Sequence, residues 1–401
     1  MTRTSVKLKF RPSATPDRMG TLYFQVIHER TVRQFATDYR IYASEWDRRR
    51  STVTISGDSG RRQTLAMLRE RTFHDMERLR RVVLSFERRG LDFCADDIIA
   101  EYRRIMQEHT LFHFMEHTIA QLRQLGKRRT SETYQAALNS FRQYRGGEDI
   151  MIDTMTSDEI RNYEASMNRR GISLNTSSFY MRILRATYNR AVENGVTEQH
   201  YPFKHVYTGV CKTVKRAITI GDIRRIRRLS LPPGTSLALA RDIFMFSFFT
   251  RGMAFVDIAF LRKRDVEGGM ITYKRHKTGQ LLRVRIEKCT QEIIDRNHNP
   301  DTDYLFPLIR KSGDEYQQYR NALRLVNRRL KQVGCMAGIP IRLTTYVGRH
   351  SWGSAAKSSN IPISVISESM GHDNIKTTQI YLISLDTSVI DDANAKILKE
   401  L

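Results

Sequence analysis

Cysteine is scarce in this sequence of 401 residues, and long apolar runs are absent. The four cysteines lie far apart with no C-x-x-C pair, which excludes a zinc ribbon and argues against a disulfide framework. No run of about 18 apolar residues occurs, so we expect no membrane-spanning segment. The first residues, MTRTSVKLKFRPS, lack the apolar core of a secretory signal. We therefore expect a soluble protein of a reducing compartment.

Negative charge is in deficit along the whole chain. There are 43 Asp and Glu residues against 67 Lys and Arg residues, which gives a formal net charge of +24. The range 201–401 holds 33 of the basic and 18 of the acidic residues, so the surplus is largest in the second half. A hydrophobic content of 40% excludes wholesale disorder. The charge therefore indicates a folded protein with a polyanionic partner, of which nucleic acid is the commonest.

The first part of the chain, residues 1–105, is expected to form an α+β domain. Residues 1–50 alternate apolar and polar side chains with a period of two, which predicts short strands. Residues 61–88 predict a long charged helix, and a second helix should run from about Asp96 to Met106. The residues expected on the apolar face of the long helix are Leu65, Leu68, Phe73, Met76, Leu79 and Val83.

The remainder of the chain is expected to form two further domains. Residues 106–200 predict a helical domain, with four short helices between positions 111 and 195. Residues 196–215 have the composition of a connector. In 201–401 the pattern is mostly helical, but the segments MITYK and LLRVRIE flank HKTGQ and predict a β-hairpin.

Four segments of the last domain carry the strongest chemical signal. They read TRGMAFVDIAFL (250–261), YKRHKTGQ (273–280), LTTYVGRHSWGSAA (343–356) and MGHDNIKTTQIY (370–381). This order of Arg, Lys, Arg, Gly-His and Tyr resembles the tyrosine recombinase, or phage-type integrase, family. The resemblance implies a mainly α multidomain fold with small β-sheets. It also implies an arm-type DNA-binding domain at 1–105, a SAM-like core-binding domain at 106–200 and a mixed α/β catalytic domain at 201–401.

The residue types in these segments suit phosphodiester chemistry. Two guanidinium groups can clamp the anionic oxygens and offset charge in the transition state. A tyrosine hydroxyl can then attack in line and form a covalent phosphotyrosine, while a lysine protonates the 5′-hydroxyl that leaves. Such a site needs no metal or other cofactor. The resemblance implies that Tyr381 is the nucleophile, Arg349 the second clamp arginine and Lys277 the acid, with Lys274 and Arg275 as alternatives for the acid.

The sequence departs from the family pattern at two positions. The family's histidine three residues before the second arginine is replaced by Tyr346, which can donate a hydrogen bond to phosphate but is a poor base near neutral pH. His350 and His372 are the alternatives for compensating it. The resemblance also implies that His372 binds a phosphate oxygen or steadies the nucleophile.

The second departure is at the first clamp arginine, whose family position falls on Ala254. The nearest arginine is Arg251, three residues earlier. Because positions i and i+3 share one face of a helix, we predict that Arg251 fills the same space, provided that 248–254 is helical. If that segment is not helical, Arg275 is the next candidate. Asp257 would brace the site.

Three other features of the sequence are candidate binding sites. His109, His113 and His117 have helical spacing, but eight residues span about 12 Å, too far for one metal ion, so we expect ordinary polar positions. The basic residues expected to contact DNA are Lys127, Arg128, Arg129, Lys212, Lys215, Arg216 and Arg275. Residues at helical spacing near the C-terminus predict a short amphipathic helix. It would pack on its own domain or, as the resemblance implies, dock on a neighbouring subunit.

Together these features predict a site-specific recombinase of double-stranded DNA that binds core and arm sites. It would act in integration and excision, or in inversion, of a mobile DNA element. The resemblance implies a homotetramer on DNA, a DNA-bending or directionality protein as a possible partner, and the bacterial cytoplasm. A type IB topoisomerase and a non-catalytic sequence-specific regulator are the alternatives.

Overall fold

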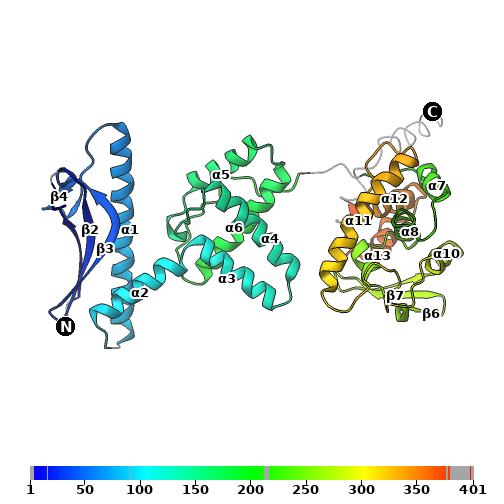
Figure 1. Cartoon of the computed structure of the whole chain (residues 1–401), viewed down its shortest axis with the longest axis horizontal. Helices are drawn as coiled ribbons and strands as arrows, with labels where there is room; N and C mark the ends of the chain where they lie inside the picture. The colour runs from blue at the N-terminus through cyan, green and yellow to red at the C-terminus, as the bar shows by residue number, and fades with distance from the viewer. Residues whose placement is uncertain are drawn as a thin grey trace. The chain divides into compact units, whose positions relative to one another are not determined.

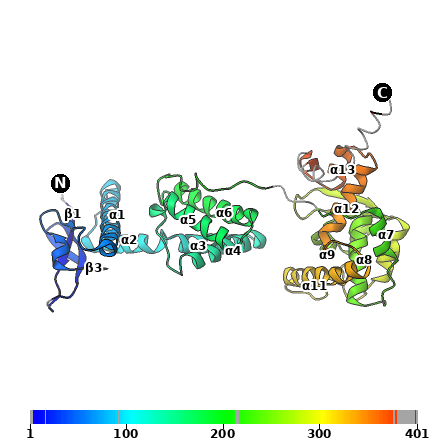
Figure 2. The ribbon, with the colours of Figure 1, turned by 90° about the horizontal axis from the view of Figure 1, so that it is seen from above.

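The computed structural model describes residues 4–15, 17–90, 92–211, 216–375, 378, 379 and 398. It is mostly helical with small antiparallel sheets, as the sequence predicts, and it forms two compact units, 1–211 and 212–401 (Figures 1 and 2). Each unit is described by itself below. None of the helices among the described residues combines the length and apolar character that a bilayer crossing requires.

The chain begins with a three-stranded antiparallel sheet in the order β1 (Ser5–Arg11), β2 (Gly20–His28) and β3 (Thr31–Ile41). Buried and half-buried residues alternate along β2, because one face of the strand covers the core and the other faces solvent. The core is formed with α1 (Ser59–Arg89) and α2 (Ala95–Glu108). A short 3₁₀ turn, η1 (Ala43–Glu45), and the pair β4 (Trp46–Asp47) and β5 (Thr52–Val53) complete this region.

The predicted long helix is confirmed as α1, but the prediction for one residue of its apolar face is wrong. Phe73 is 60% exposed, whereas Thr72 beside it is buried. With 3.6 residues per turn, Leu65, Thr72 and Leu79 recur on one face, and Phe73 falls outside that stripe.

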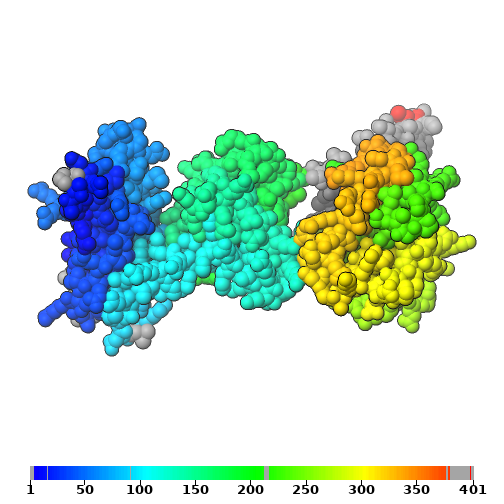
Figure 3. All heavy atoms as spheres, in the orientation of Figure 1, coloured from blue at the N-terminus to red at the C-terminus, as the bar shows by residue number. Residues whose placement is uncertain are grey.

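The rest of the first unit is a helical bundle, and the four predicted helices are confirmed. They are α3 (Leu111–Gln124), α4 (Arg128–Tyr144), α5 (Ser157–Arg169) and α6 (Leu174–Glu193), with a 3₁₀ turn, η2 (Ile152–Thr154), before α5. The bundle has its own core, distinct from that of the N-terminal region. In the space-filling view the surface continues from the N-terminal region through α2 into the bundle (Figure 3).

The connector predicted at 196–215 is attached to the bundle over much of its length. Phe203 is buried in the bundle core. The Asn175 side chain donates to the carbonyl of Cys211 at 3.0 Å and accepts from its N–H at 2.8 Å. Because these bonds satisfy backbone groups, the chain follows α6 as far as Cys211. Residues 212–215 are outside the described residues.

The second unit surrounds an apolar central helix, α8 (Ser236–Phe249), which is buried by α11 (Glu315–Met336) and α12 (Thr345–Ser358). The predicted hairpin is confirmed as β7 (Met270–Lys274) and β8 (Leu281–Arg285). The other elements are α7 (Ile220–Arg228), α9 (Phe255–Phe260), η3 (Lys263–Asp265), β6 (Val266–Glu267), α10 (Lys288–Arg296) and α13 (Ile363–Ser369).

Candidate active site

The segment after α8 is a loop, and this corrects the helical premise for Arg251. Helix α8 ends at Phe249 and α9 begins at Phe255, with Arg251 and Gly252 at positive φ angles of 60° and 74° between them. Arg251 therefore does not share a helix face with Ala254. Its guanidinium instead points to β8, where Nη1 donates to the carbonyl of Arg283 at 3.4 Å. By the condition stated above, Arg275 becomes the candidate for the first clamp arginine.

Arg349 lies on α12 and is 3% exposed. Its Nη1 donates to the carbonyl of Gly252 at 2.5 Å, and its Nη2 donates to the carbonyl of Met370 at 2.8 Å. No carboxylate forms an ion pair with Arg349 within the described residues. The positive charge is therefore buried and oriented by the main chain, but it is not neutralised.

A second buried arginine approaches the same place from the hairpin. Arg275 follows β7, is 6% exposed, and donates through Nη1 to the carbonyl of Gly371. Burial lowers the pKa of Arg275, and the nearby charge of Arg349 lowers it further. Arg275 likewise has no carboxylate in ion-pair range in the described part of the chain. Two like charges held this close favour an anion between or beside them.

His372 completes the cluster as a neutral imidazole. Its Nε2 lies 3.1 Å from Nη2 of Arg349, and its Nδ1 lies 2.7 Å from Oγ1 of Thr378. Because a guanidinium can only donate, Nε2 must accept, and the proton therefore sits on Nδ1 and is donated to Thr378. Burial lowers the pKa of His372 to about 4, and the charges of Arg349, Arg275 and Lys277 act in the same direction.

The hairpin turn that carries Lys277 is anchored on the side facing α9. Asp257, which is buried on α9, accepts from the backbone N–H of His276 at 2.9 Å, and its Oδ1 also lies 3.1 Å from Nδ1 of His276. The His276 ring packs against Phe260 with 5.0 Å between centroids. Lys277 itself is exposed. No local sequence pattern indicates a role for His276, because its partner Asp257 is 19 positions away.

Tyr346 lies on the exposed side of the cluster, in the first turn of α12. It is 54% exposed and meets the buried His350 edge-on, with ring centroids 4.8 Å apart. It is close enough to Arg275 to contribute to the electrostatics of that residue. Tyr381, the predicted nucleophile, is outside the described residues.

The residues predicted to contact DNA fall in several places. Lys127, Arg128 and Arg129 are exposed at the start of α4. Arg129 borders a cleft of about 470 Å³ between α4 and α6 that also includes Tyr180. Arg216 is exposed, whereas Lys212 and Lys215 lie outside the described residues.

The metal alternative for the three histidines has no support in the structure. His109 caps the end of α2, whereas His113 and His117 belong to α3, so the three do not share one helix. No cluster of three metal-ligating side chains occurs among the residues that the structure describes.

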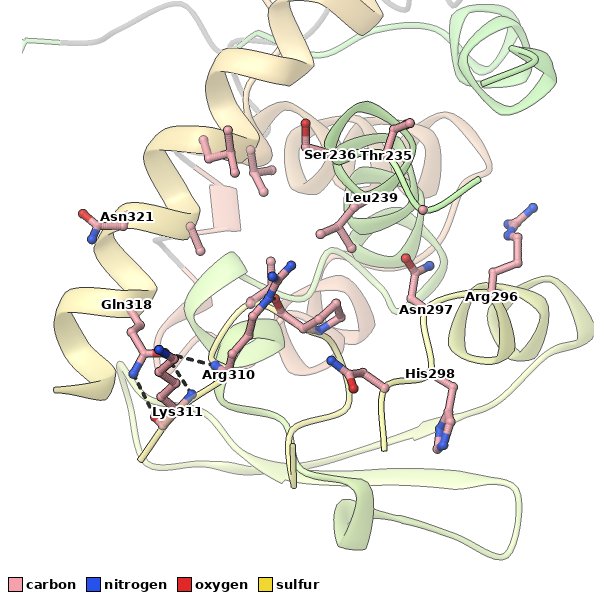
Figure 4. Close-up of a pocket in the computed structure, with 17 residues that line it drawn as sticks. Thr235, Ser236, Leu239, Arg296, Asn297, His298, Arg310, Lys311, Gln318 and Asn321 are labelled. Carbon is pink, nitrogen blue, oxygen red and sulfur yellow. Dashed lines mark hydrogen bonds between the residues drawn. The ribbon is translucent and has the colours of Figure 1, made fainter. Parts of the chain in front are cut away.

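A cavity of about 820 Å³ lies at the start of α8, where Thr235, Ser236 and Leu239 line it (Figure 4). Its floor is apolar, and its rim carries Arg296, His298, Arg310 and Lys311 without any Asp or Glu. The Gln318 side chain accepts from the backbone N–H groups of Arg310 and Lys311, at 3.0 and 3.2 Å, which fixes the loop that bears these cations. Since α8 has 14 residues, its two ends are about 20 Å apart.

Comparisons with known proteins agree with this arrangement. Residues 110–206 match the model of the phage integrase SAM-like domain, and residues 252–387 match the model of the phage integrase family. The tyrosine recombinase XerA of Thermococcus onnurineus is 27% identical over 223 residues, which cover 54% of this chain and 73% of that protein. XerC of Alcanivorax borkumensis is 23% identical over 239 residues, which cover 57% of this chain and 75% of that protein.

Two solved structures share the fold. A lambda integrase dimer bound to a core site matches with a TM-score of 0.55 and 14% identity, covering 70% of this chain and 96% of that chain. The Tn1549 transposon integrase in complex with a circular intermediate DNA matches with a TM-score of 0.52 and 14% identity, covering 73% of this chain and 99% of that chain. The chain thus belongs to the tyrosine recombinase, or phage integrase, family of enzymes that break and rejoin DNA strands at specific sites.

Proposed function

We propose that the cluster around Arg275 and Arg349 is where this recombinase cleaves and rejoins DNA. The observation that carries this proposal is the pair of buried guanidiniums with no carboxylate in ion-pair range among the described residues. Buried cations without a counter-charge are costly unless an anion joins them, and the scissile phosphate supplies that anion. Arg251 becomes a third, more exposed cation of the site.

In the proposed reaction the hydroxyl of Tyr381 loses its proton to water, attacks the phosphorus in line and forms a bond from its oxygen to the 3′-phosphate. The bond to the 5′-oxygen breaks, and Lys277 protonates that oxygen so that it leaves as a hydroxyl. Arg275 and Arg349 offset the charge of the pentavalent transition state, while Tyr346 donates a hydrogen bond to a phosphate oxygen. Rejoining is the reverse reaction with a different 5′-hydroxyl, so no external energy source is required.

His372 is proposed to orient the site as a neutral acceptor. With a pKa of about 4 it carries no charge near neutral pH, and its Nδ1 proton is committed to Thr378. Its Nε2 accepts from Nη2 of Arg349, whereas the Gly252 carbonyl accepts from Nη1. The imidazole therefore fixes the orientation of the Arg349 guanidinium, and it does not itself donate a proton to the phosphate.

The first unit is proposed to bind double-stranded DNA at two surfaces. In the N-terminal sheet, Lys7, Lys9 and Arg11 alternate away from the core along β1, and the Arg11 guanidinium lies over the ring of Tyr23 at 5.2 Å. This basic face suits an arm site. The basic start of α4, with the cleft between α4 and α6, suits the core site.

A homotetramer on DNA is the proposed assembly. The C-terminal segment 383–401 combines apolar residues with Asp386, Asp391 and Asp392. The 820 Å³ cavity at the start of α8 has an apolar floor and a cationic rim, which suits such a segment from a neighbouring subunit. A DNA-bending or directionality protein is a further proposed partner.

The biological role that we propose is integration and excision, or inversion, of a DNA element in the bacterial cytoplasm, where such DNA is found. A type IB topoisomerase and a decayed regulator fit the family matches less well. The regulator would bind its site without forming a covalent complex, and the topoisomerase would relax a plasmid that carries no specific site.

Covalent trapping tests the proposal directly. The protein is mixed with a nicked suicide duplex that carries the end sequence of its own element, and the products are separated on a denaturing gel. We expect a protein–DNA band that Tyr381→Phe abolishes while site binding in a gel shift is retained, because phenylalanine lacks the attacking oxygen. A band that persists in Tyr381→Phe would assign the nucleophile elsewhere, and specific binding without any band, with or without added cell extract, would favour the regulator.

A further inference from the structure

A buried arginine connects the N-terminal region to the helical bundle. Arg78 lies on α1, in the N-terminal region, and is 5% exposed. Its Nη2 contacts Oδ1 of Asp153 at 2.5 Å, and its Nε donates to Oδ2 of the same carboxylate at 2.9 Å. Asp153 belongs to η2, in the bundle, so this two-point ion pair joins residues 75 positions apart. A bidentate pair of this kind fixes both distance and orientation.

The ion pair continues into the N-terminal sheet. Nη1 of Arg78 donates to Asp75 at 2.6 Å, and Asp75 also accepts from the hydroxyl of Tyr39, on β3, at 2.9 Å. Arg81 adds a contact of 3.3 Å to Asp153 from the surface. A continuous chain of hydrogen bonds therefore runs from β3 through α1 to η2.

The charges in this hydrogen-bond network balance one another. Burial raises the pKa of Asp153, but the hydrogen bonds and charge of Arg78 outweigh burial, so its pKa lies below the ordinary value. Burial likewise disfavours the charged form of Arg78, and its two carboxylate partners restore it. Buried ions persist only with such partners, and removing one of them leaves an uncompensated charge inside the protein.

The segment that bears Asp153 is itself tied to the junction between α2 and α3. The N–H of Leu111 donates to the carbonyl of Ile150 at 2.8 Å, and the N–H of Ile152 donates to the carbonyl of His109 at 3.1 Å. The junction between the two regions is thus closed twice, by main-chain bonds beside the α2–α3 turn and by the Arg78 ion pair on α1.

The apolar cores contribute little to this junction. The N-terminal core and the bundle core form separate clusters, and a cleft of about 660 Å³ that includes Arg78 and Met151 lies where the two regions meet. The polar contacts must therefore supply most of the rigidity of the junction between the N-terminal region and the bundle.

We propose that residues 4–211 act as one rigid body whose joint is the Tyr39–Asp75–Arg78–Asp153 network. The N-terminal sheet and the bundle then keep a fixed geometry, although the sequence predicts them as separate domains. This inference concerns the mechanics of the chain and stands independently of the proposed site of DNA cleavage.

The test is calorimetric unfolding of the full-length protein with Arg78→Met and a matched control, Arg80→Met. Arg80 lies on the same helix, pairs with Glu77 three residues before it, and is exposed. We expect the wild-type first unit to unfold in one transition and Arg78→Met to split it into two, because the regions become independent. The folding equilibrium of the bundle should fall about 100-fold or more in Arg78→Met and hardly change in the control. An effect as small as that of Arg80→Met, or a wild type whose first unit already unfolds in two transitions, would overturn the proposal.

A second measurement covers the case in which Arg78→Met does not fold. Hydrogen exchange of the wild-type protein should give the amides of 78–83 and 150–153 a common opening rate, since one cooperative unit opens together. The milder variant Asp153→Asn should separate the two rates. Different opening rates in the wild type would contradict a rigid joint.

Discussion

The two units bury arginines in opposite ways. In the first unit, Arg78 is enclosed by the carboxylates of Asp75 and Asp153. In the second unit, Arg349 and Arg275 are equally buried but donate to main-chain carbonyls, and neither forms an ion pair with a described carboxylate. A carbonyl orients a guanidinium without cancelling its charge. The first arginine thus has its charge balanced by carboxylates, whereas the other two have no carboxylate in ion-pair range among the described residues.

The comparison also shows why burial alone does not identify a functional arginine. The exposures of Arg78, Arg275 and Arg349 are 5%, 6% and 3%. What differs is the counter-charge, and with it the consequence of substitution, which should be loss of stability in one case and loss of chemistry in the other.

The largest expected effect comes from replacing a buried arginine by methionine, once in the second unit at Arg349 and once in the first unit at Arg78. Arg349→Met should lower the rate of strand cleavage about 10³-fold, because it removes a clamp on the transition state. It should lower the melting temperature less than Arg78→Met does, since only uncharged acceptors, two carbonyls and the imidazole of His372, lose their donor. Cleavage of the suicide duplex and calorimetry measure the two effects. A variant of Arg349 that melts as early as Arg78→Met would break the comparison.

The next effect distinguishes two arginines near the hairpin. Arg275→Ala should lower the cleavage rate about 10²-fold or more, because Arg275 is buried beside Arg349. Arg251→Ala should lower it less than about tenfold, since its guanidinium is more exposed and is directed at the Arg283 carbonyl. Single-turnover cleavage of one substrate by both variants gives the ratio. The reverse order would return the first clamp position to Arg251.

The smallest expected effect is on the pH dependence of folding stability, and it concerns the protonation of His372. As pH falls from 6.5 toward 4, the unfolded chain binds a proton at this residue while the folded chain does not, so the folded state loses stability over that range. Imidazole nitrogen shifts should report a neutral ring with the proton on Nδ1 until about pH 4. His372→Gln should make the acid-side decline of stability shallower. Titration of this ring near the ordinary pKa of 6.5 would show that the arginines beside it carry a counter-charge.

Patterns of residues close in the sequence were enough to predict most of the helices and strands. The period of two in 1–50, the four helices of the bundle and the turn at Gly279 all depend on residues close in sequence, and they are confirmed. Phe73 was misplaced because six apolar residues were assigned to one face on which only part of them fit a period of 3.6. The attachment of Cys211 to Asn175 depends on residues 36 positions apart, which no local pattern contains.

For the site, the sequence resemblance predicts candidate residues but not their partners. Arg349 and His372 were predicted, and the structure brings them within 3.1 Å of each other. The contact of Arg275 with the Gly371 carbonyl joins positions 96 apart, and so its burial could not be foreseen. The prediction for Arg251 is wrong because α8 already ends at Phe249, and both Arg251 and Gly252 have positive φ angles.

The carbonyls that hold Arg349 have a consequence for how this sequence can vary. Every residue type offers a carbonyl, so the side chain at Met370 can change while the arginine keeps its hydrogen bond. Gly252 has no such freedom, because its φ is 74° and an added Cβ would lie 3.0 Å from Cγ of Arg349. The hydrogen bonds of Arg349 therefore constrain the residue type only at Gly252, and elsewhere they constrain only the path of the main chain.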